Sequence, residues 1–388
     1  MSFITVHVLR SLPMHNLNRD QNGMPKSQFD GGIQRGRLSS QAIKRPARIA
    51  FRDAVAHLGA PASIRTMDSN AAARVVTMAE SFAAAGNKSF NTAAAKKTAN
   101  AVVKGLAKKL KAGEAEEKSA EGKADSPEAV AEKKDNILLF SDAELETLAL
   151  AIVEEQNGGS EATSNDFIQD FASPSLDVAA FGRMFAARAD LSTQAAVAVS
   201  HAVMTHEMSL TIDYFTAVDE MDEDKTDSGA GHLGLAYYTS GVYYSTFTID
   251  PAQLRRSWTG FGAPAAEDQL KALVKALVEA LPTGKLTNTN AHTRPFLVLV
   301  ENQRSRAVYE FETPVIQAEN GGFTQPSIDA LSRQYAMART FDAGNYLNTV
   351  LYTSEATAEF AGAESAASID DLTSHVASFV FANEQVSA

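Results

Sequence analysis

A predicted helix that begins after Ser39 carries a row of cations on one face, because positions four residues apart lie one above the other on an α-helix. Lys44, Arg48 and Arg52 follow this spacing, and Arg45 lies beside them. Ser39, Ser40 and Gln41 offer caps and free backbone N–H groups at the helix start, where the helix dipole favours an anion. Such an arrangement can hold a phosphodiester chain, although a solvated basic face is the commoner meaning of a charge run.

The segment before this helix adds groups of the same chemistry. Residues 11–38 show little periodicity and are punctuated by Asn, Gly and Pro, which predicts a long functional loop. It contains four cations, Arg19, Lys26, Arg35 and Arg37. It also contains Gly31 and Gly32, which permit close approach of a ligand to the backbone. Residues 1–52 hold nine basic and two acidic residues, whereas the 388-residue chain has a net charge of −12. This asymmetry indicates a polyanion site on one surface.

The sequence contains no signature of catalysis or metal binding. There is no cysteine, which excludes disulfides, thiolate zinc sites and cysteine nucleophiles. His201 and His206 are five residues apart and do not share a helical face, so a hydrogen-bonding role is favoured for both. Thr283-Gly284-Lys285 lacks the upstream glycine and the following hydroxyl residue of a phosphate-binding loop. We therefore expect no enzyme activity, no metal site and no cofactor.

The composition is that of a globular protein. Hydrophobic residues make up 45% and charged residues 21% of the chain, which is enough apolar material for a sizeable core. The N-terminal run MSFITVHVLRSLP lacks the basic start and long apolar stretch of a signal peptide. No segment reaches the ~18 to 20 apolar residues of a membrane span. Together with the lack of cysteine, these features predict a cytoplasmic protein that does not contact a membrane.

Strand and helix patterns alternate along the chain. Apolar runs predict strands at Phe3–Leu9, Val242–Ile249, Phe296–Val300 and Val308–Val315. Helices are predicted from Ser39 or Ser40 to about Leu58 with a kink at Pro46, over 60–100, 141–155 and about 191–206, over Ala266–Leu281, and over Ile328–Thr340 with Ser327 as its cap. The C-terminal residues are weakly patterned. This mixture predicts an α+β fold with helices on one face of an antiparallel sheet, compatible with the βαββαβ order of RNA-binding sheet domains.

Two segments differ from this core. From residue 88 to residue 134 the composition shifts to Lys, Ala, Glu and Gly, with eleven lysines and seven acids. This predicts a mobile or partly helical insertion that buries little core. Residues 208–240 join the apolar-aromatic piece Ile212–Val218 to five acids between Asp219 and Asp224, followed by glycines. We expect a projecting, hairpin-like loop there.

Short motifs spread over nearly the whole chain occur in the order typical of one protein family. In the first part of the chain they are Asn18-Arg19-Asp20, Gly31-Gly32, Arg37-Leu38-Ser39-Ser40-Gln41, Lys44-Arg45 and Gly182-Arg183-Met184. Further on they are Thr205-His206, Asp213-Tyr214-Phe215-Thr216-Ala217-Val218-Asp219, His232-Leu233-Gly234, Ser240-Gly241-Val242 and Gln325-Pro326-Ser327-Ile328. Each motif is weak alone, but together they are highly specific. The sequence resembles the CasC family, the backbone subunit of the type I-E CRISPR surveillance complex, Cascade.

The resemblance implies a subunit built like a right hand. Its palm would be a modified RNA-recognition (ferredoxin-like) fold made of residues 1–58, 196–207 and 241–388. Helical fingers would be inserted at 59–195, and a thumb loop would project at 208–240. Several copies would form a helical filament along one CRISPR RNA, each thumb reaching the neighbour's segment of guide. The implied partners are the CRISPR RNA, further copies of the chain, other Cascade subunits and, through the guide, target DNA in antiviral defence.

Carried over motif by motif, the resemblance also implies which residues bind RNA. Guide phosphates would be held by Arg19, Lys26, Ser39, Gln41, Lys44, Arg45 and Arg48. The same RNA-binding set includes Gly31, Gly32, Arg35, Arg37 and Arg183. Met184, Phe215, Thr216 and Val218 would pack where the thumb displaces a guide nucleotide. Composition alone favours a core position for Phe215, and the resemblance replaces that interpretation.

Two other functions stay open from the sequence. Related backbone subunits of other CRISPR types cut RNA with an acid in the loop before this helix, and Asp30 lies there. A loop-capping aspartate is the favoured interpretation of Asp30. A stand-alone RNA-binding scaffold protein would carry the same cations. Uniform, guide-length RNA bound to the purified protein would favour the CRISPR function, and RNA of mixed length would favour the scaffold.

Overall fold

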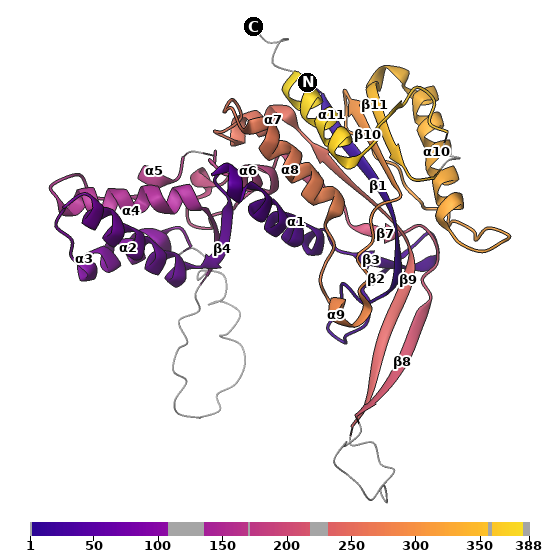
Figure 1. Cartoon of the computed structure of the whole chain (residues 1–388), viewed down its shortest axis with the longest axis horizontal. Coiled ribbons are helices and arrows are strands. Elements are labelled where there is room, and N and C mark those ends of the chain that lie inside the picture. Colours follow the sequence, from indigo (N-terminus) through magenta and orange to yellow (C-terminus); the bar gives the residue numbers. More distant parts are fainter. Residues whose placement is uncertain (1, 108–135, 170, 218–231, 356–358, 383–388) are drawn as a thin grey trace, which may run out of the picture. The chain divides into compact units, whose positions relative to one another are not determined.

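The computed structural model describes residues 2–107, 136–169, 171–217, 232–355 and 359–382 (Figure 1). The chain divides into two compact units. The first unit comprises Met1–Ala50, Ala198–Pro251 and Lys271–Ala388, and the second comprises Phe51–Val197 and Ala252–Leu270. Both units are therefore assembled from segments that are far apart in the sequence.

A mostly antiparallel sheet, ten-stranded in the described part of the chain, forms the centre of the first unit. Its four middle strands lie in the order β10 (Leu297–Gln303), β1 (Phe3–His15), β9 (His232–Ile249) and β7 (Ala202–Met204). Each neighbouring pair is antiparallel. With the helices α1 (Ser40–Val55) and α8 (Ala266–Glu279), the chain order of these elements is β1–α1–β7–β9–α8–β10. This is the βαββαβ order of the ferredoxin-like fold, so the predicted α+β, RNA-recognition-like class is confirmed.

The strand β1 is buried at every position from Ile4 to Arg10. A strand covered on both faces shows a continuous rather than an alternating apolar pattern, which is why its N-terminal half is easy to predict. The polar side chains within it are paired. His7 Nε2 lies 3.0 Å from Glu301 Oε2 on β10, and Thr5 Oγ1 donates to Gln303 Oε1 at 2.9 Å. These bonds satisfy polar groups that would otherwise destabilise the core.

Residues 11–38 are predicted to form one continuous loop, but only residues 16–26 do so. β1 extends to His15, and β2 (Ser27–Asp30) and β3 (Ile33–Leu38) form an antiparallel hairpin next to β7. Its two-residue turn is Gly31-Gly32, with φ angles of +59° and +78°. Positive φ at both central residues defines the type I′ turn that joins hairpin strands, and glycine adopts it without strain. These two glycines are therefore needed by the fold itself.

The strand β8 (Leu210–Ala217) pairs with the first part of β9 in a hairpin that extends from the sheet (Figure 1). Residues 241–249 of β9 pair with β1 and residues 232–238 pair with β8, while Thr239 pairs with both strands. The predicted hairpin is confirmed for these strands. Val218 and the acidic run Asp219–Asp224 lie outside the described residues.

The helix α1 follows β3 after one residue, and Ser39 is its N-cap as predicted. Ser39 Oγ accepts the N–H of Ala42 at 3.4 Å. The helix continues through Pro46 to Val55, and a 3₁₀ turn (Ala56–Leu58) follows. The predicted end near Leu58 is thus confirmed, Pro46 lies inside the helix as predicted, and the kink expected there stays a prediction.

The C-terminal part of the first unit differs most from its predicted elements. Residues 308–315 are not a strand, although Tyr309, Phe311 and Val315 point inward at an alternating spacing. Helix α10 (Thr324–Phe341) begins before Ser327, whose Oγ lies 2.8 Å from Thr205 Oγ1 in the core. Ser327 is therefore a buried contact and not the cap.

After α10 the chain forms a 3₁₀ turn (Ala343–Asn345), β11 (Tyr346–Thr353), β12 (Glu364–Ser365) and α11 (Ile369–Phe381). The weakly patterned C-terminal residues form a helix in α11, and residues 383–388 lie outside the described residues. Ser368 Oγ caps this helix by accepting the N–H of Asp371 at 3.1 Å, and Leu372 and Val376 are fully buried. Small residues around these anchors hide the periodicity in the sequence.

The second unit packs helices against a two-stranded sheet. β4 (Ser63–Met67) and β5 (Ile137–Ser141) are antiparallel, and α2 (Asp68–Ala85), α3 (Thr92–Gly105) and α4 (Asp142–Gln156) share one apolar core. Alanine recurs on these helices because it favours helix and allows close approach. Three short helices and a 3₁₀ turn complete the described elements of this region: α5 (Ser164–Phe167), α6 (Leu176–Phe181), α7 (Pro251–Ser257) and Ala189–Leu191. The short strand β6 (Val197–Val199) that follows pairs with β9 in the sheet of the first unit.

Two predictions fail in and beside this unit. The helix expected at about 191–206 is replaced by β6 and β7, because the β-branched valines there pair with the sheet. The segment 88–134 was expected to bury little core, but α3 places Ala95, Ala99 and Val103 in the apolar core of the unit. Residues 108–134 lie outside the described residues.

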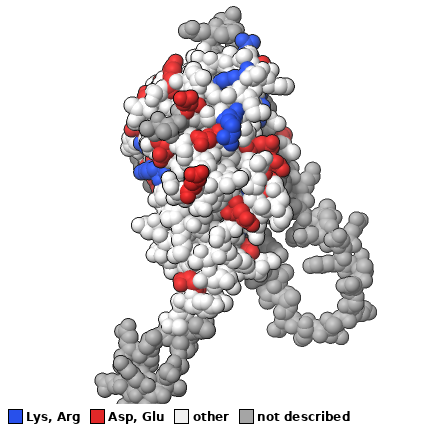
Figure 2. Space-filling view, turned by 90° about the vertical axis from the view of Figure 1, so that its right-hand side faces the viewer, with Lys and Arg blue, Asp and Glu red and all other residues white. Residues whose placement is uncertain are grey.

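Charge is distributed unevenly over the first unit. Figure 2 shows the face that carries α10, on which acidic and basic side chains are intermixed over the upper part. The lower part, toward β8 and β9, is mostly free of charged side chains on this face. The predicted cationic residues belong to a different part of this unit, around the start of α1.

Candidate nucleic-acid interface

Asn18 joins the three segments that carry the predicted RNA-binding cations. Its main-chain oxygen accepts the N–H of Lys26 at 2.8 Å, and its side-chain Oδ1 accepts the N–H of Ser39 at 2.9 Å. The main-chain oxygen of Lys26 accepts the N–H of Arg37 at 2.8 Å. These bonds fix the loop 16–26, the end of β3 and the start of α1 relative to one another.

The loop 16–26 is closed by the carboxylate of Asp20. Asp20 Oδ1 accepts the N–H groups of Asn22 (2.8 Å) and Met24 (3.0 Å). This turn geometry uses the only acid of the loop to order its backbone. The neighbouring Arg19 is exposed, and no acid of the described ranges lies within ion-pair distance of its guanidinium. Arg19 therefore presents an uncompensated charge to solvent.

The first turn of α1 presents one N–H group to a ligand and not several. Ser39 Oγ takes the N–H of Ala42, and His201 Nδ1 accepts that of Ser40 at 2.8 Å. In the part of the chain that the structure describes, the main-chain N–H of Gln41 is the one in this turn that has no acceptor. The expectation of several free N–H groups here is wrong, because protein side chains already satisfy two of them.

His201 is a residue of this site that the sequence did not assign to RNA binding. It lies 161 positions from Ser40 in the chain, and no spacing signal connects the two. Because Nδ1 accepts a hydrogen bond, the neutral ring carries its proton on Nε2. Burial lowers the pKa of His201, and the positive charges of Arg37 and Lys26 lower it further. The ring thus adds a hydrogen-bond donor without adding charge.

The hydrogen-bonding role predicted for the two histidines is confirmed. His206 Nδ1 donates to the main-chain oxygen of Glu207 at 2.7 Å, and its Nε2 accepts the N–H of Val242 at 3.1 Å. Across the described ranges, no group of three His, Asp or Glu side chains is placed to hold a metal ion. Within the same ranges, no helix has the length and apolarity needed to cross a bilayer.

The cations of α1 lie beside its buried stripe. Ile43 and Ala47 face the core, with 6% and 0% of their surface exposed. Arg45 is exposed, and Lys44 and Arg48 are half-buried. Burial lowers the pKa of Lys44, which is the direction expected when an ammonium group loses part of its hydration shell.

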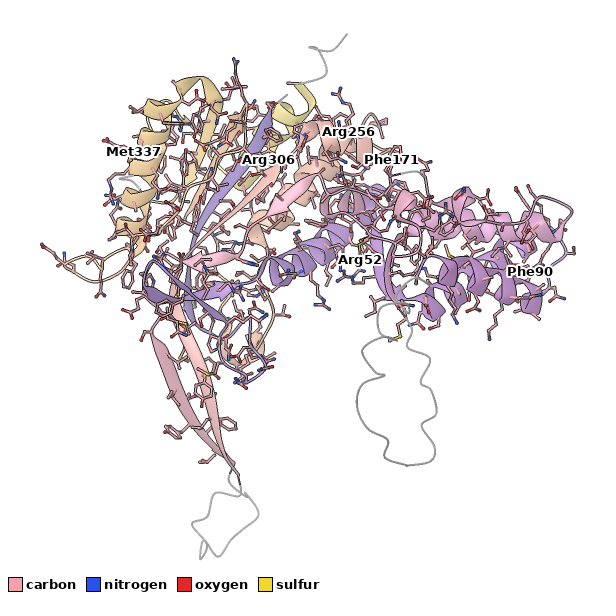
Figure 3. All side chains as sticks on the ribbon, turned by 180° about the vertical axis from the view of Figure 1, so that it is seen from behind. Arg52, Phe90, Phe171, Arg256, Arg306 and Met337 are labelled. Atoms are coloured by element: carbon pink, nitrogen blue, oxygen red, sulfur yellow. The ribbon has the colours of Figure 1, made fainter. Side chains whose placement is uncertain are left out.

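Arg37 completes the group of cations near the helix start. Its Nε is buried and has no hydrogen-bond partner within the described ranges. A buried guanidinium N–H without an acceptor costs free energy, and a phosphate oxygen would supply one. We call Arg19, Lys26, Arg37, Lys44, Arg45 and Arg48 the cationic surface. Arg52, labelled in Figure 3, lies further along α1 in the second unit, 3.8 Å from Asp53.

Arg35 does not belong to the cationic surface. It is fully buried, and its guanidinium donates to the main-chain oxygens of Met204 (3.2 Å) and Glu312 (2.8 Å). Burial lowers the pKa of Arg35. A Cβ at Gly31 would clash with the main-chain oxygen of Glu312. This glycine therefore allows two segments of the same chain to lie backbone against backbone, and it is not open to a ligand. The expectation that Arg35 holds a phosphate is not supported, because protein carbonyls already occupy its donors.

Arg183 is likewise buried, in the second unit. Its Nη1 lies 2.5 Å from Glu144 Oε2, and both side chains are almost fully buried. The ion pair satisfies Glu144, which also caps α4 by accepting the N–H of Ser141 at 2.8 Å. Arg183 therefore contributes to the fold through this ion pair, while its Nε and Nη2 are buried without a hydrogen-bond partner in the described ranges, and its role in RNA binding stays a prediction.

Met184 differs from its neighbour because 79% of its surface is exposed. It lines a cavity of about 610 Å³ with Phe171 and Arg256, the two residues labelled on this part of the chain in Figure 3. An exposed methionine beside an aromatic ring and a guanidinium offers an apolar contact for a nucleobase. The packing of Met184 at a displaced nucleotide stays a prediction.

On the hairpin, the ring of Phe215 lies across Gly234. These residues are paired in the register of β8 and β9, and a Cβ at Gly234 would lie 2.1 Å from the ring. About half of Phe215 is exposed. The opposite face of the hairpin exposes Ile212, Tyr214 and Leu235. Thr216 is exposed near the end of the described ladder.

A βαββαβ sheet in this strand order defines the class of ferredoxin-like, RNA-recognition-like folds. The chain belongs to the CT1975-like protein family of Cas proteins, whose sequence pattern matches residues 4–375.

The fold is also similar to solved structures. A chain of a "CRISPR RNA-guided surveillance complex, pre-nicking" has a TM-score of 0.75 and 24% sequence identity, covering 98% of this chain and 100% of that one. A chain of another "CRISPR RNA-guided surveillance complex" has a TM-score of 0.61 and 20% identity over the same shares. No curated protein matches the sequence.

Proposed function

We propose that the chain is a non-catalytic, RNA-binding backbone subunit of a CRISPR surveillance complex of the type I-E, CasC kind. The observation that carries this proposal is the set of hydrogen bonds around Asn18, which gathers the cationic surface at the start of α1. Family membership and the likeness to chains of RNA-guided complexes support it. In a chain of net charge −12, such a local concentration of cations favours a polyanionic partner.

The cationic surface would hold the guide RNA by its phosphates. Arginine and lysine contacts to phosphate position an RNA strand without reading its sequence. The polar groups beside them, the N–H of Gln41 and the Nε2 of His201, would add neutral donors. Sequence recognition would come from base pairing by the guide, as in other RNA-guided effectors. This division of labour explains a binding protein that needs no catalytic group and no base-specific pocket.

The β8–β9 hairpin would link successive copies along the RNA. The exposed apolar side chains of this two-stranded ribbon are Ile212, Tyr214 and Leu235. An isolated ribbon of this kind is only marginally stable unless another protein surface packs against it. A neighbouring copy bound to the next segment of guide would cover this face. Phe215, held over Gly234, would meet the RNA from the other face of the ribbon.

Analysis of the co-purified RNA tests the proposed function. We expect the protein, expressed with a CRISPR array, to purify with RNA of one length that contains spacer sequence. The matched control is a Lys44→Ala, Arg45→Ala, Arg48→Ala variant, which should lose this RNA while remaining folded. Wild-type protein that purifies without RNA, or with RNA of mixed length and cellular sequence, would overturn the proposal.

A guide-dependent ribonuclease is not favoured by any contact of Asp30. This residue ends β2 next to the glycine turn, and its main-chain oxygen accepts the Nε of Arg35 at 3.3 Å. Such contacts belong to the hairpin and offer no acid–base partner. We therefore retain the non-catalytic function.

A further inference from the structure

The connection between α8 and β10 lies directly against the loop 16–26. It contains one short helix, α9 (Leu286–Thr289). A Cβ at Gly284 would lie 2.5 Å from the main-chain oxygen of Leu17 and 3.1 Å from that of Asn16. The two segments therefore meet backbone to backbone, at a distance that only glycine allows. Residues 283–290, which we call the α9 loop, are thus fixed next to the loop that carries Arg19.

Side-chain packing places the α9 loop and the cationic surface on one small core. Leu286 packs against the cluster that includes Leu17 of the loop 16–26, Leu38 at the end of β3 and Ile43 in the first turn of α1. This cluster lies beneath all three segments that Asn18 connects. The position of the α9 loop relative to the cationic surface is therefore determined by buried contacts within the first unit.

Lys285 is held at the base of the β8–β9 hairpin by a strained backbone. Its φ is +48°, a left-handed conformation that is unfavourable for a residue with a side chain. Its Nζ lies 5.2 Å from the centre of the Tyr238 ring, and Tyr238 pairs with Thr211 near the start of β8. No acid of the described ranges is within ion-pair distance of Lys285. The ammonium group thus lies between the two segments expected to meet RNA, without a counter-charge.

The composition around Lys285 favours a polyanion. Acids make up 47 of the 388 residues, but none occurs from residue 280 to residue 300. The exposed side chains of the α9 loop are neutral hydrogen-bonding groups at Thr283, Thr287, Asn288 and Asn290. Asn290 is also left-handed, with a φ of +45°. Backbone strain of this kind is retained at sites where it orients a functional group.

We propose that the α9 loop is a second RNA-binding element, in which Lys285 holds a phosphate of the same strand that the cationic surface binds. This inference rests on the proposed function, because it assigns a further residue to the same ligand. The phosphate would bridge the loop 16–26 and the base of the hairpin. Neither the family motifs nor the charge run on α1 points to this residue.

Affinity for a single-stranded oligouridylate of fixed length, measured against salt concentration, tests the assignment. Lys285→Gly removes the ammonium group and also relieves the left-handed strain. We expect the slope of log K against log salt to fall by roughly 0.7 per subunit bound, the value for one phosphate contact on a single strand. The thermal midpoint should stay the same or rise. Lys285→Arg, which keeps the charge, should keep the slope.

The control is Lys275→Ala, which removes the same charge from α8, where Lys275 pairs with Asp370 at 2.7 Å. It should leave the slope unchanged. If Lys285→Gly behaves like this control while Lys44→Ala lowers the slope, the α9 loop does not bind RNA although the proposed function stands. If the wild type itself shows no salt-dependent RNA binding, the proposed function fails and this inference fails with it. A Lys285→Gly variant with weaker binding and an unchanged or raised thermal midpoint supports a role in binding, because a purely structural role would not separate the two.

Discussion

The side-chain oxygen of Asn18 lies 2.9 Å from the main-chain nitrogen of Ser39, and this hydrogen bond joins an exposed loop to the cap of a helix. Ser39 is nearly buried, so its N–H needs a protein acceptor. The bond therefore sets the distance between the cations of the loop 16–26 and those of α1. A phosphodiester strand that contacts both sets depends on this distance, although Asn18 itself carries no charge.

Replacing Asn18 tests this relationship. Asn18→Ala leaves the N–H of Ser39 without its acceptor, which should destabilise the fold by about 1–3 kcal/mol. RNA affinity should also fall, because Arg19 and Lys26 lose their fixed position. Chemical denaturation and RNA titration measure the two effects. The control is Asn22→Ala, at an exposed position of the same loop, which should change neither. Wild-type RNA affinity in a folded Asn18→Ala protein would contradict the role given to this bond.

Lys44 and Arg48 are expected to bind guide phosphates. On single-stranded RNA, Lys44→Ala should lower the slope of log K against log salt by roughly 0.7 per subunit bound, and Arg48→Ala should act similarly. The loss should be equal for two unrelated spacers, because phosphates carry no base identity. Lys275→Ala again serves as the charge-matched control. An unchanged slope would return these residues to a solvated face, and a loss confined to one spacer would indicate base recognition instead.

The purified complex is expected to have no nuclease activity of its own. Guide-matched RNA and DNA, incubated with the complex and divalent metal ions, should remain intact by gel electrophoresis. Asp30→Ala provides the diagnostic variant, because Asp30 is the acid in the position used by related cutting subunits. Cleavage by the wild type that disappears in Asp30→Ala would replace the proposed function by a ribonuclease.

Stability should decrease in mild acid because of His15, which ends β1 just before the loop 16–26. Burial lowers the pKa of His15 from 6.5 to about 4, while its Nε2 lies 3.1 Å from the hydroxyl of Tyr243. The unfolded chain thus binds a proton at a pH where the folded chain does not. The stabilisation is complete above about pH 6.5 and is lost as the pH falls toward 4.

Denaturation between pH 4 and 8 measures this effect. His15→Asn should flatten the dependence of unfolding free energy on pH in this window. His57→Asn, at an exposed position, should leave the dependence unchanged. An identical pH profile for wild type and His15→Asn would show that His15 is not the group responsible.

The sequence by itself determined the fold class and predicted which cations line the start of α1. The continuous apolar run of β1, the serine cap before α1 and the spacing of Lys44 and Arg48 are local patterns, and local patterns follow from backbone geometry and side-chain direction. The family motifs, read in order, added the expectation of an RNA-binding backbone subunit.

Only the tertiary structure decided which of the predicted site residues are held by protein contacts. Arg35 and Arg37 are two positions apart on one strand, yet carbonyl groups from distant segments hold the first, while the second has a buried N–H with no acceptor among the residues that the structure describes. His201 reaches Ser40 across 161 positions of sequence, and Gly284 meets Leu17 from the other half of the chain. Burial and hydrogen bonding depend on contacts between distant segments, and no local periodicity in the sequence reports such contacts. For this reason the types of residue at the site could be predicted from the sequence, but which individual residues belong to it could not.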